Sequence, residues 1–298
     1  MKTAMKLNEK KAELLLAAVI AVRASSFMFN KFLLTELGVF NILGLRFLIA
    51  GVLLALLFHK RLRALRHREL LGGAILGLLF FGVIGVEMTA TKMTDTSTVS
   101  LLENCSIVIV PIFESVLTRR LPNRITVLSI LTAFVGVICL TLHHGSFSYG
   151  MLLALLAAVV YAAAILTTTR VSRGDVDPLN VGVVQVLTLG VLAMAVSVLF
   201  ETPRLPQSGI SWFRILWLAC VCAGFGFTLQ PLAQKHISSA ARAGTFCALS
   251  PATATFLGVV VLHESLGAAG VIGLVLILLG MVLPHLPVAK KLTSQKGG

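Results

Sequence analysis

The chain has 298 residues, of which 57% are hydrophobic and only 12% are charged, and its mean hydropathy is +0.96. A soluble domain carries roughly twice that charged fraction, so too little polar material is present to cover a water-facing surface. The formal net charge of +13 lies in short connectors between apolar runs, which indicates membrane orientation and excludes a nucleic-acid-binding face. The composition therefore predicts a polytopic membrane protein.

The N-terminus resembles a secretory signal. Basic residues precede the apolar run 14–20, and Val22-Arg-Ala24 imitates a cleavage site. Apolar character resumes after Arg23 and continues to Leu34, however. We therefore expect a first helix that is retained.

Ten apolar stretches are long enough to cross the hydrocarbon core, which takes about 20 helical residues. In chain order they are 12–34, 39–58, 69–91, 97–118, 124–143, 149–170, 178–200, 209–232, 240–262 and 267–286. The third and eighth stretches are rich in glycine, which lets helices approach closely or bend.

Orientation follows from the distribution of Lys and Arg. The N-terminus, the connectors after the second, fourth, sixth and eighth stretches, and the C-terminal tail hold 19 of these 25 residues. The opposite connectors hold only Lys92, Arg204 and Arg214. The positive-inside rule then predicts that both termini are cytoplasmic.

The sequence repeats itself: residues 17–136 match residues 157–280 at an offset of about 140 positions. Pro111 recurs as Pro251, and Asn41 recurs as Asn180. Each copy holds five helices, an odd number, so the second copy enters the membrane in the opposite sense. We predict an all-α membrane protein of ten transmembrane helices, built as two inverted five-helix repeats over residues 1–145 and 146–298.

These features resemble the drug/metabolite transporter superfamily, in its ten-helix form with two EamA-type repeats. The resemblance covers nearly the whole chain. It is carried by Arg46, by the serine-to-proline segments Ser97–Pro111 and Ser238–Pro251, by His263-Glu264-Ser-Leu, and by Gly273-x6-Gly280.

The chain also departs from this family pattern. Arg23-Ala24 stands where the family often has Trp-Gly, and the Glu that follows the proline survives as Glu264 but is replaced near Asn123-Arg124. The resemblance implies a proton-coupled, exchange or facilitative carrier of small metabolites in the cytoplasmic membrane, commonly an exporter. It does not fix the substrate.

Charged side chains within the apolar stretches mark the candidate site, because each costs roughly 2.5–3.5 kcal/mol at the bilayer centre. Arg23, Ser26 and Asn30 form one polar stripe on the first helix, and Ser100 and Glu103 share a face of the fourth. The predicted substrate-binding residues are Arg23, Ser26, Asn30, Arg46, Glu87, Ser100, Glu103, Asn104, Tyr161, Gln185 and Gln230. Charges of both signs would suit a zwitterion such as an amino acid.

Other roles for these residues stay open. The charged groups would also serve as structural ion pairs, and burial suits Glu103 to carry a proton. Pro111 and Pro251 are expected hinges, with simple helix packing as the alternative. Glu264 is expected to cap or hinge its own connector, and Glu69 to lie on a solvated face.

Several other functions fit the sequence less well. There is no Walker A motif, so ATP drive within this chain is disfavoured. The cysteines lie in apolar runs as packing thiols, and we expect no metal and no cofactor. A membrane-embedded enzyme lacks the carboxylate or His clusters that it needs. A channel, a lipid flippase or a scaffold without transport remains an alternative. The expected partners are a small solute, the lipid bilayer and protons, with the chain a monomer or a homodimer.

Overall fold

The computed structural model describes residues 9–119, 124–143, 147–172, 176–226 and 249–283, and within these ranges the regular elements are all helical. Their order is α1 (Glu9–Leu33), α2 (Val39–Leu57), α3 (His59–Leu62), α4 (His67–Met93), α5 (Thr96–Asn104), α6 (Ser106–Thr118), α7 (Arg124–His143), α8 (Tyr149–Ser172), α9 (Pro178–Phe200), α10 (Gly209–Leu216), the π-helix η1 (Trp217–Phe225), α13 (Leu249–Val261) and α14 (Ala268–Val282). The expected boundary between repeats, at residues 145 and 146, lies outside the described residues.

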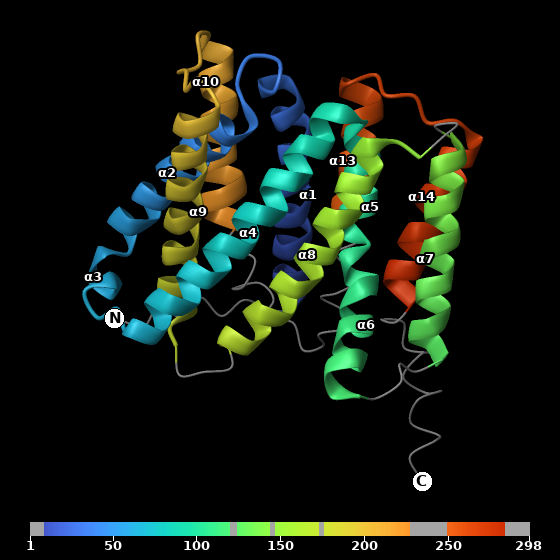
Figure 1. The fold of residues 1–298 in the computed structure, drawn as a ribbon, viewed down its shortest axis with the longest axis horizontal. Coiled ribbons are helices and arrows are strands. Elements are labelled where there is room, and N and C mark those ends of the chain that lie inside the picture. The colour runs from blue at the N-terminus through green and yellow to red at the C-terminus, as the bar shows by residue number, and fades with distance from the viewer. Residues whose placement is uncertain (1–8, 120–123, 144–146, 173–175, 227–248, 284–298) are drawn as a thin grey trace.

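The fold class is that of a membrane protein, as predicted. Six described helices are long and apolar enough to cross a bilayer, and four shorter apolar helices accompany them. Each of the ten predicted stretches contains one of these. Figure 1 shows most of them running between the same two faces of the molecule. We call the face that carries α3, with its exposed Lys60 and Arg61, the basic side, and the other face the opposite side.

The strongest helix contacts join the first half of the chain to the second. Helix α2 packs on α9, α7 packs on α14, and α4 packs on both α8 and α9. Helix α13 lies between α1 and α5. Glycines permit two of these close approaches, because a Cβ on Gly190 would lie 2.7 Å from the Leu48 backbone nitrogen, and one on Gly280 would lie 2.9 Å from the Ser129 carbonyl oxygen.

The predicted fourth helix is interrupted. It consists of α5 and α6, with Cys105 between them. The Asn104 side chain donates to the Ser100 carbonyl at 2.8 Å, and the Cys105 backbone N–H turns to Leu102 at 3.1 Å. Side chains that bind carbonyls four residues back compete with the helical ladder and bend it. The predicted stretch 97–118 is therefore present as an apolar span over Thr96–Leu117, which the break at Cys105 divides into two helices.

The predicted eighth helix also changes its geometry. It begins as α10 and continues from Trp217 as a π-helix. The wider winding accompanies a hydrogen bond from the Trp217 indole to the Ser25 hydroxyl on α1, at 3.1 Å. π-Helical segments occur often at functional sites, and this one lies beside α1.

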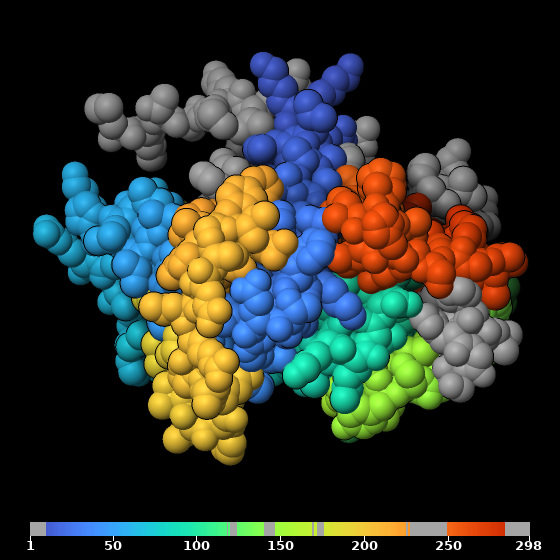
Figure 2. Space-filling view, turned by 90° about the horizontal axis from the view of Figure 1, so that it is seen from above, coloured from blue at the N-terminus to red at the C-terminus, as the bar shows by residue number. Residues whose placement is uncertain are grey.

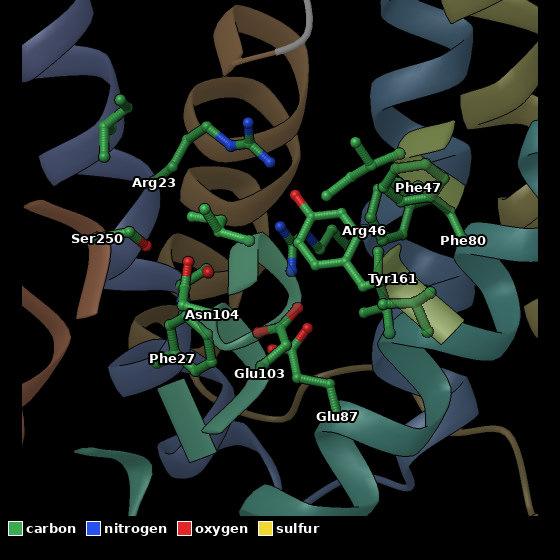
Figure 3. Close-up of a pocket in the computed structure, with 16 residues that line it drawn as sticks. Arg23, Phe27, Arg46, Phe47, Phe80, Glu87, Glu103, Asn104, Tyr161 and Ser250 are labelled. Carbon is green, nitrogen blue, oxygen red and sulfur yellow. The ribbon is translucent and has the colours of Figure 1, made fainter. Parts of the chain in front are cut away.

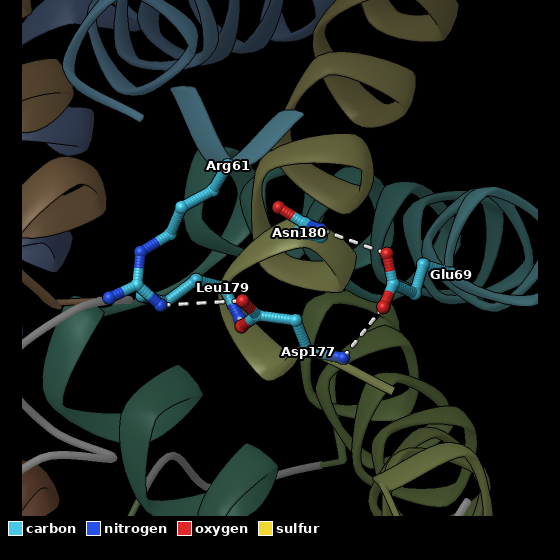
Figure 4. A network of polar contacts seen from close by, with 5 residues as sticks. All are labelled: Arg61, Glu69, Asp177, Leu179 and Asn180. Carbon is cyan, nitrogen blue, oxygen red and sulfur yellow. Dashed lines mark hydrogen bonds and ion pairs between the residues drawn. The ribbon is translucent and has the colours of Figure 1, made fainter. Parts of the chain in front are cut away.

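Glu69 is buried, so our expectation of a solvated face was wrong. Its side chain accepts hydrogen bonds from the Asp177 backbone N–H at 2.8 Å and from the Asn180 amide at 2.8 Å, and the residue is only 2% exposed (Figure 4). The carboxylate thereby caps the start of α9, a helix of the other half. The basic residues that precede Glu69 in the sequence suggested a solvated position, but packing against the start of α9 buries its side chain.

A second carboxylate makes the reciprocal contact. Glu201, which follows α9, accepts from the backbone N–H groups of Phe40 at 3.1 Å and Asn41 at 2.8 Å. It therefore caps α2 in the first half of the chain. The first turn of α2 contains Asn41, the repeat equivalent of Asn180. The two caps stand at opposite ends of the packed α2–α9 pair.

Candidate solute-binding site

A cavity of about 190 Å³ lies midway along the helices, and α1, α2, α4, α5, α6, α8 and α13 contribute to its wall (Figure 3). Seven of the predicted binding residues line it: Arg23, Ser26, Arg46, Glu87, Glu103, Asn104 and Tyr161. These seven residues were predicted from five separate helices, and the fold places all of them around one cavity.

Three of the charged side chains in this cavity are buried: Arg46, Glu87 and Glu103. No ion pair or hydrogen bond joins any of these three side chains to another residue in the described part of the chain. The Arg46 Nε atom is buried without a hydrogen-bond partner, and its guanidinium carbon lies 4.8 Å from the centre of the Phe47 ring. A buried polar atom left unsatisfied is costly, so a polar ligand at this place would be stabilised.

The carboxylates and guanidinium groups share one electrostatic environment. Figure 3 shows the Glu87 and Glu103 carboxyl groups side by side, with Arg46 directly above them in this view and Arg23 farther away at the upper left. The charges of Arg46 and Arg23 act on Glu87, and those of Glu87 and Arg23 act on Glu103. The site thus offers both signs of charge to a solute.

Local structure sets the direction of these side chains. The bend at Cys105 follows directly after Glu103 and Asn104, which lie at the last turn of α5. Gly226 leaves room for Arg23, since a Cβ there would lie 2.7 Å from the Arg23 Cδ atom. The aromatic rings of Phe27, Phe47, Phe80 and Tyr161 supply the apolar part of the wall.

The remaining predicted residues lie elsewhere. Asn30 is buried beyond the cavity on α1, Ser100 is buried one turn before Glu103, and Gln185 is buried in α9, which packs on α4. Gln230 lies outside the described residues. Pro111 lies within α6, and Pro251 lies buried near the start of α13. Their hinge role stays a prediction.

Sequence reasoning missed some of the lining. Ser250 contributes from α13, and the phenylalanines from α1, α2 and α4. A serine or phenylalanine is ordinary in an apolar stretch, so neither carried a signal. The only sequence feature that pointed to Ser250 is its position directly before Pro251, the repeat equivalent of Pro111.

The lining side chains differ in exposure along α1 and along the fourth span. On α1, Arg23 and Ser26 are partly exposed, whereas Asn30, about 10 Å farther toward the opposite side, is 1% exposed. On the fourth span, residues 96–103 are all buried, and Asn104 and Ile107 are partly exposed. The partly exposed lining residues Arg23, Ser26 and Asn104 thus lie nearer the basic side than Asn30 and Ser100, although Ile20, one turn nearer still, is only 5% exposed.

The opposite side is closed by contacts between connectors. Lys31 donates to the carbonyls of Thr91 and Thr94, both at 2.7 Å, and so fixes the end of α1 to the end of α4. Glu264 accepts from Thr96 and Ser97 at the start of α5. Figure 2, which looks onto this side, shows the α1–α2 turn in blue beside the red segment around α13 and α14.

The comparisons with known proteins agree with this architecture. The chain is 25% identical over 265 residues to an uncharacterized transporter of Clostridium kluyveri, covering 83% of each chain. It is 27% identical over 284 residues to the uncharacterized transporter YetK of Bacillus subtilis, covering 89% of this chain and 84% of that one. A solved crystal structure with 20% sequence identity has the same fold, with a TM-score of 0.67 over 97% of this chain and 99% of that one.

The sequence pattern of one family matches this chain twice, over residues 10–142 and over residues 148–284. Those two matches cover nearly all of the described helices. The chain belongs to the EamA-like transporter family.

Proposed function

We propose that this protein is a secondary transporter that carries a small polar metabolite, such as an amino acid, across the cytoplasmic membrane by alternating access. Protons couple to the movement through Glu103 and Glu87, and net movement is export. The two halves, 1–145 and 146–298, act as inverted repeats that rock about the central cavity.

The observation that carries this proposal is the cavity itself. It lies midway along the membrane-spanning helices and holds Arg46, Glu87 and Glu103, buried and unpaired with one another in the described structure. Charges in the membrane interior are expensive and are typically found on substrate or ion pathways. The aromatic wall adds apolar contact, so the site suits a solute with charged and apolar parts.

The exposure of the lining residues supports export. The partly exposed Arg23, Ser26 and Asn104 lie toward the basic side, and the excess of Lys and Arg makes that side cytoplasmic under the positive-inside rule. A site that opens to the cytoplasm takes up its solute from there. Release then needs the contacts on the opposite side to open.

Counterflow in proteoliposomes tests the proposal. The purified chain is reconstituted with unlabelled solute inside, and uptake of trace labelled amino acids, nucleosides, sugars or organic cations is followed. A carrier gives saturable uptake and a transient overshoot for its solute class. A channel gives neither, and a linear, non-saturating flux for every solute would overturn the proposal.

A further inference from the structure

The side chain of Glu264 makes a contact with the start of α5 that solute binding does not require. The Glu264 side chain, in the connector after α13, accepts hydrogen bonds from the backbone N–H groups of Thr96 at 2.6 Å and Ser97 at 3.0 Å. These groups belong to the first turn of α5, in the other half of the chain. We had expected Glu264 to serve its own connector, and this was wrong.

Helix α5 depends on this distant carboxylate. Its N-cap residue is Asp95, a residue type that often caps helices, but the Asp95 side chain makes no capping hydrogen bond here. The unpaired N–H groups at a helix start need an acceptor, and a carboxylate also matches the positive end of the helix dipole. Glu264 fills both needs.

The backbone around Glu264 is built to present it. His263 has a φ of 57°, in the left-handed region that a residue with a Cβ seldom adopts. This turn brings the Glu264 N–H back to the Gly258 carbonyl at 3.0 Å. A Cβ on Gly258 would collide with the Glu264 carboxyl group, so only glycine leaves room for it. Strain of this kind persists where the surroundings enforce it.

The sequence does not repeat the Glu264 carboxylate in the first half of the chain. At the repeat offset, the position that corresponds to Glu264 is Arg124, at the start of α7. Arginine has only hydrogen-bond donors, so it does not accept from the start of a helix. The two caps on α2 and α9, by contrast, come in a reciprocal pair made by Glu201 and Glu69.

We propose that Glu264 is a positioning residue and a latch: it holds α5, and with it Glu103 and Asn104, while keeping the opposite side closed. The inference rests on the proposed alternating access. Because its repeat equivalent is an arginine, the latch stabilises the state open to the basic side and not its counterpart. Breaking it shifts the population toward the state open to the opposite side.

Cysteine labelling in membrane vesicles tests this without knowledge of the substrate. In a background whose five native cysteines are replaced by alanine, Ser97→Cys reports on the opposite side and Ile107→Cys on the basic side of the cavity. A membrane-impermeant maleimide is applied to each side in turn. We expect Glu264→Ala to speed labelling at position 97 about tenfold and to slow labelling at position 107.

Two further variants test whether a change in labelling comes from loss of the hydrogen bonds between Glu264 and the start of α5. Glu264→Gln keeps the side-chain size but replaces one acceptor oxygen by a donor, so it loses one of the two hydrogen bonds. Gly258→Ala leaves Glu264 in place and displaces its carboxyl group. Both should move the two reporters in the same directions as Glu264→Ala, and Gly182→Ala, which meets nothing within 4 Å, should move neither.

Glu201→Ala is the matched control, because it removes a carboxylate cap from α2 and not from α5. It should leave labelling at position 97 unchanged. The latch is refuted if Glu264→Ala accelerates both reporters, as general loosening would, or changes neither. Should counterflow by the parent protein fail while the labelling shift is seen, the latch stands and the transport proposal does not.

Discussion

The chemistry of the cavity rests on a few charged side chains that form no ion pair with one another within the described structure. Arg46, Glu87 and Glu103 come from three different helices, and no ion pair of 4 Å or less forms among them. A structural ion pair, the alternative that the sequence left open, would bring a guanidinium and a carboxylate together. The observed separation favours a role in binding a solute.

The role of Arg23 in binding is tested by adding one methyl group beside it. Gly226→Ala would place a Cβ against the Arg23 side chain and displace its guanidinium group from the cavity. We expect the apparent KM of the solute identified by counterflow to rise about tenfold, a loss of about 1.4 kcal/mol.

Gly82→Ala is the control for this change, because a Cβ there would meet nothing within 4 Å. Concentration-dependent uptake in the same proteoliposomes provides the measurement. An unchanged KM in Gly226→Ala, with normal folding, would show that the position of Arg23 does not matter for binding.

Sequence reasoning located the charged residues of the site because a charge in an apolar stretch has few explanations. Asn30 and Ser100 were assigned to the site only because they share a helix face with Arg23 and Glu103. Helical spacing does not show which residues along such a face lie at the depth of the cavity. Ser250 and the phenylalanines were missed for the opposite reason, since their types are common in any membrane helix.

At the scale of the helices, capping carboxylates join the two halves of the chain. Glu69 caps α9, Glu201 caps α2 and Glu264 caps α5, and each cap crosses from one half to the other. Such contacts were not predictable, because Glu69 lies in the first turn of α4 beside basic residues and Glu264 lies in a connector, and solvation is the ordinary expectation at both places. The interruption at Cys105 was likewise hidden, since it arises from side-chain competition for backbone carbonyls.

The cap on α9 predicts a difference between two neighbouring substitutions. Glu69→Ala removes a buried carboxylate and leaves an N–H of Asp177 and the amide of Asn180 without it, which should cost about 2 kcal/mol of stability. Arg61→Ala removes an ion pair with Asp177 whose side chains are 57% and 32% exposed, and should cost about 0.5 kcal/mol or less (Figure 4).

Thermal unfolding of the purified protein in detergent, followed by tryptophan fluorescence or light scattering, compares the two variants. The melting temperature should fall clearly for Glu69→Ala and barely for Arg61→Ala. Equal falls would mean that the buried contacts of Glu69 contribute no more than a solvated ion pair.

For the whole molecule, the two halves are interleaved and do not form separate bodies. The α2–α9 and α7–α14 pairs each join equivalent helices, and α4 packs on α8 and α9. The hydropathy made the ten apolar helices predictable, because it is a property of the entire chain. Which helices meet across the halves depends on small residues such as Gly190 and Gly280, whose partners no spacing rule identifies.

The proposed direction in which the cavity opens also belongs to this scale. It rests on the exposure of Arg23 and Ser26 against the burial of Asn30, and on the contacts of Lys31 and Glu264 on the opposite side. The net charge of the connectors predicts which side is cytoplasmic, but it carries no information on which side is closed.

In the proposed mechanism the buried charged side chains of the cavity bind the solute, and a pair of substitutions examines this role. Glu103→Gln neutralises a buried carboxylate in the cavity, whereas Glu114→Gln neutralises an exposed one farther along the same span. Counterflow with an imposed proton gradient is compared for both variants and the parent protein. We predict that Glu103→Gln lowers uptake at least about tenfold and removes its response to the gradient, while Glu114→Gln transports like the parent. Transport at the parental rate by Glu103→Gln, or equal losses in both variants, would show that Glu103 has no such role.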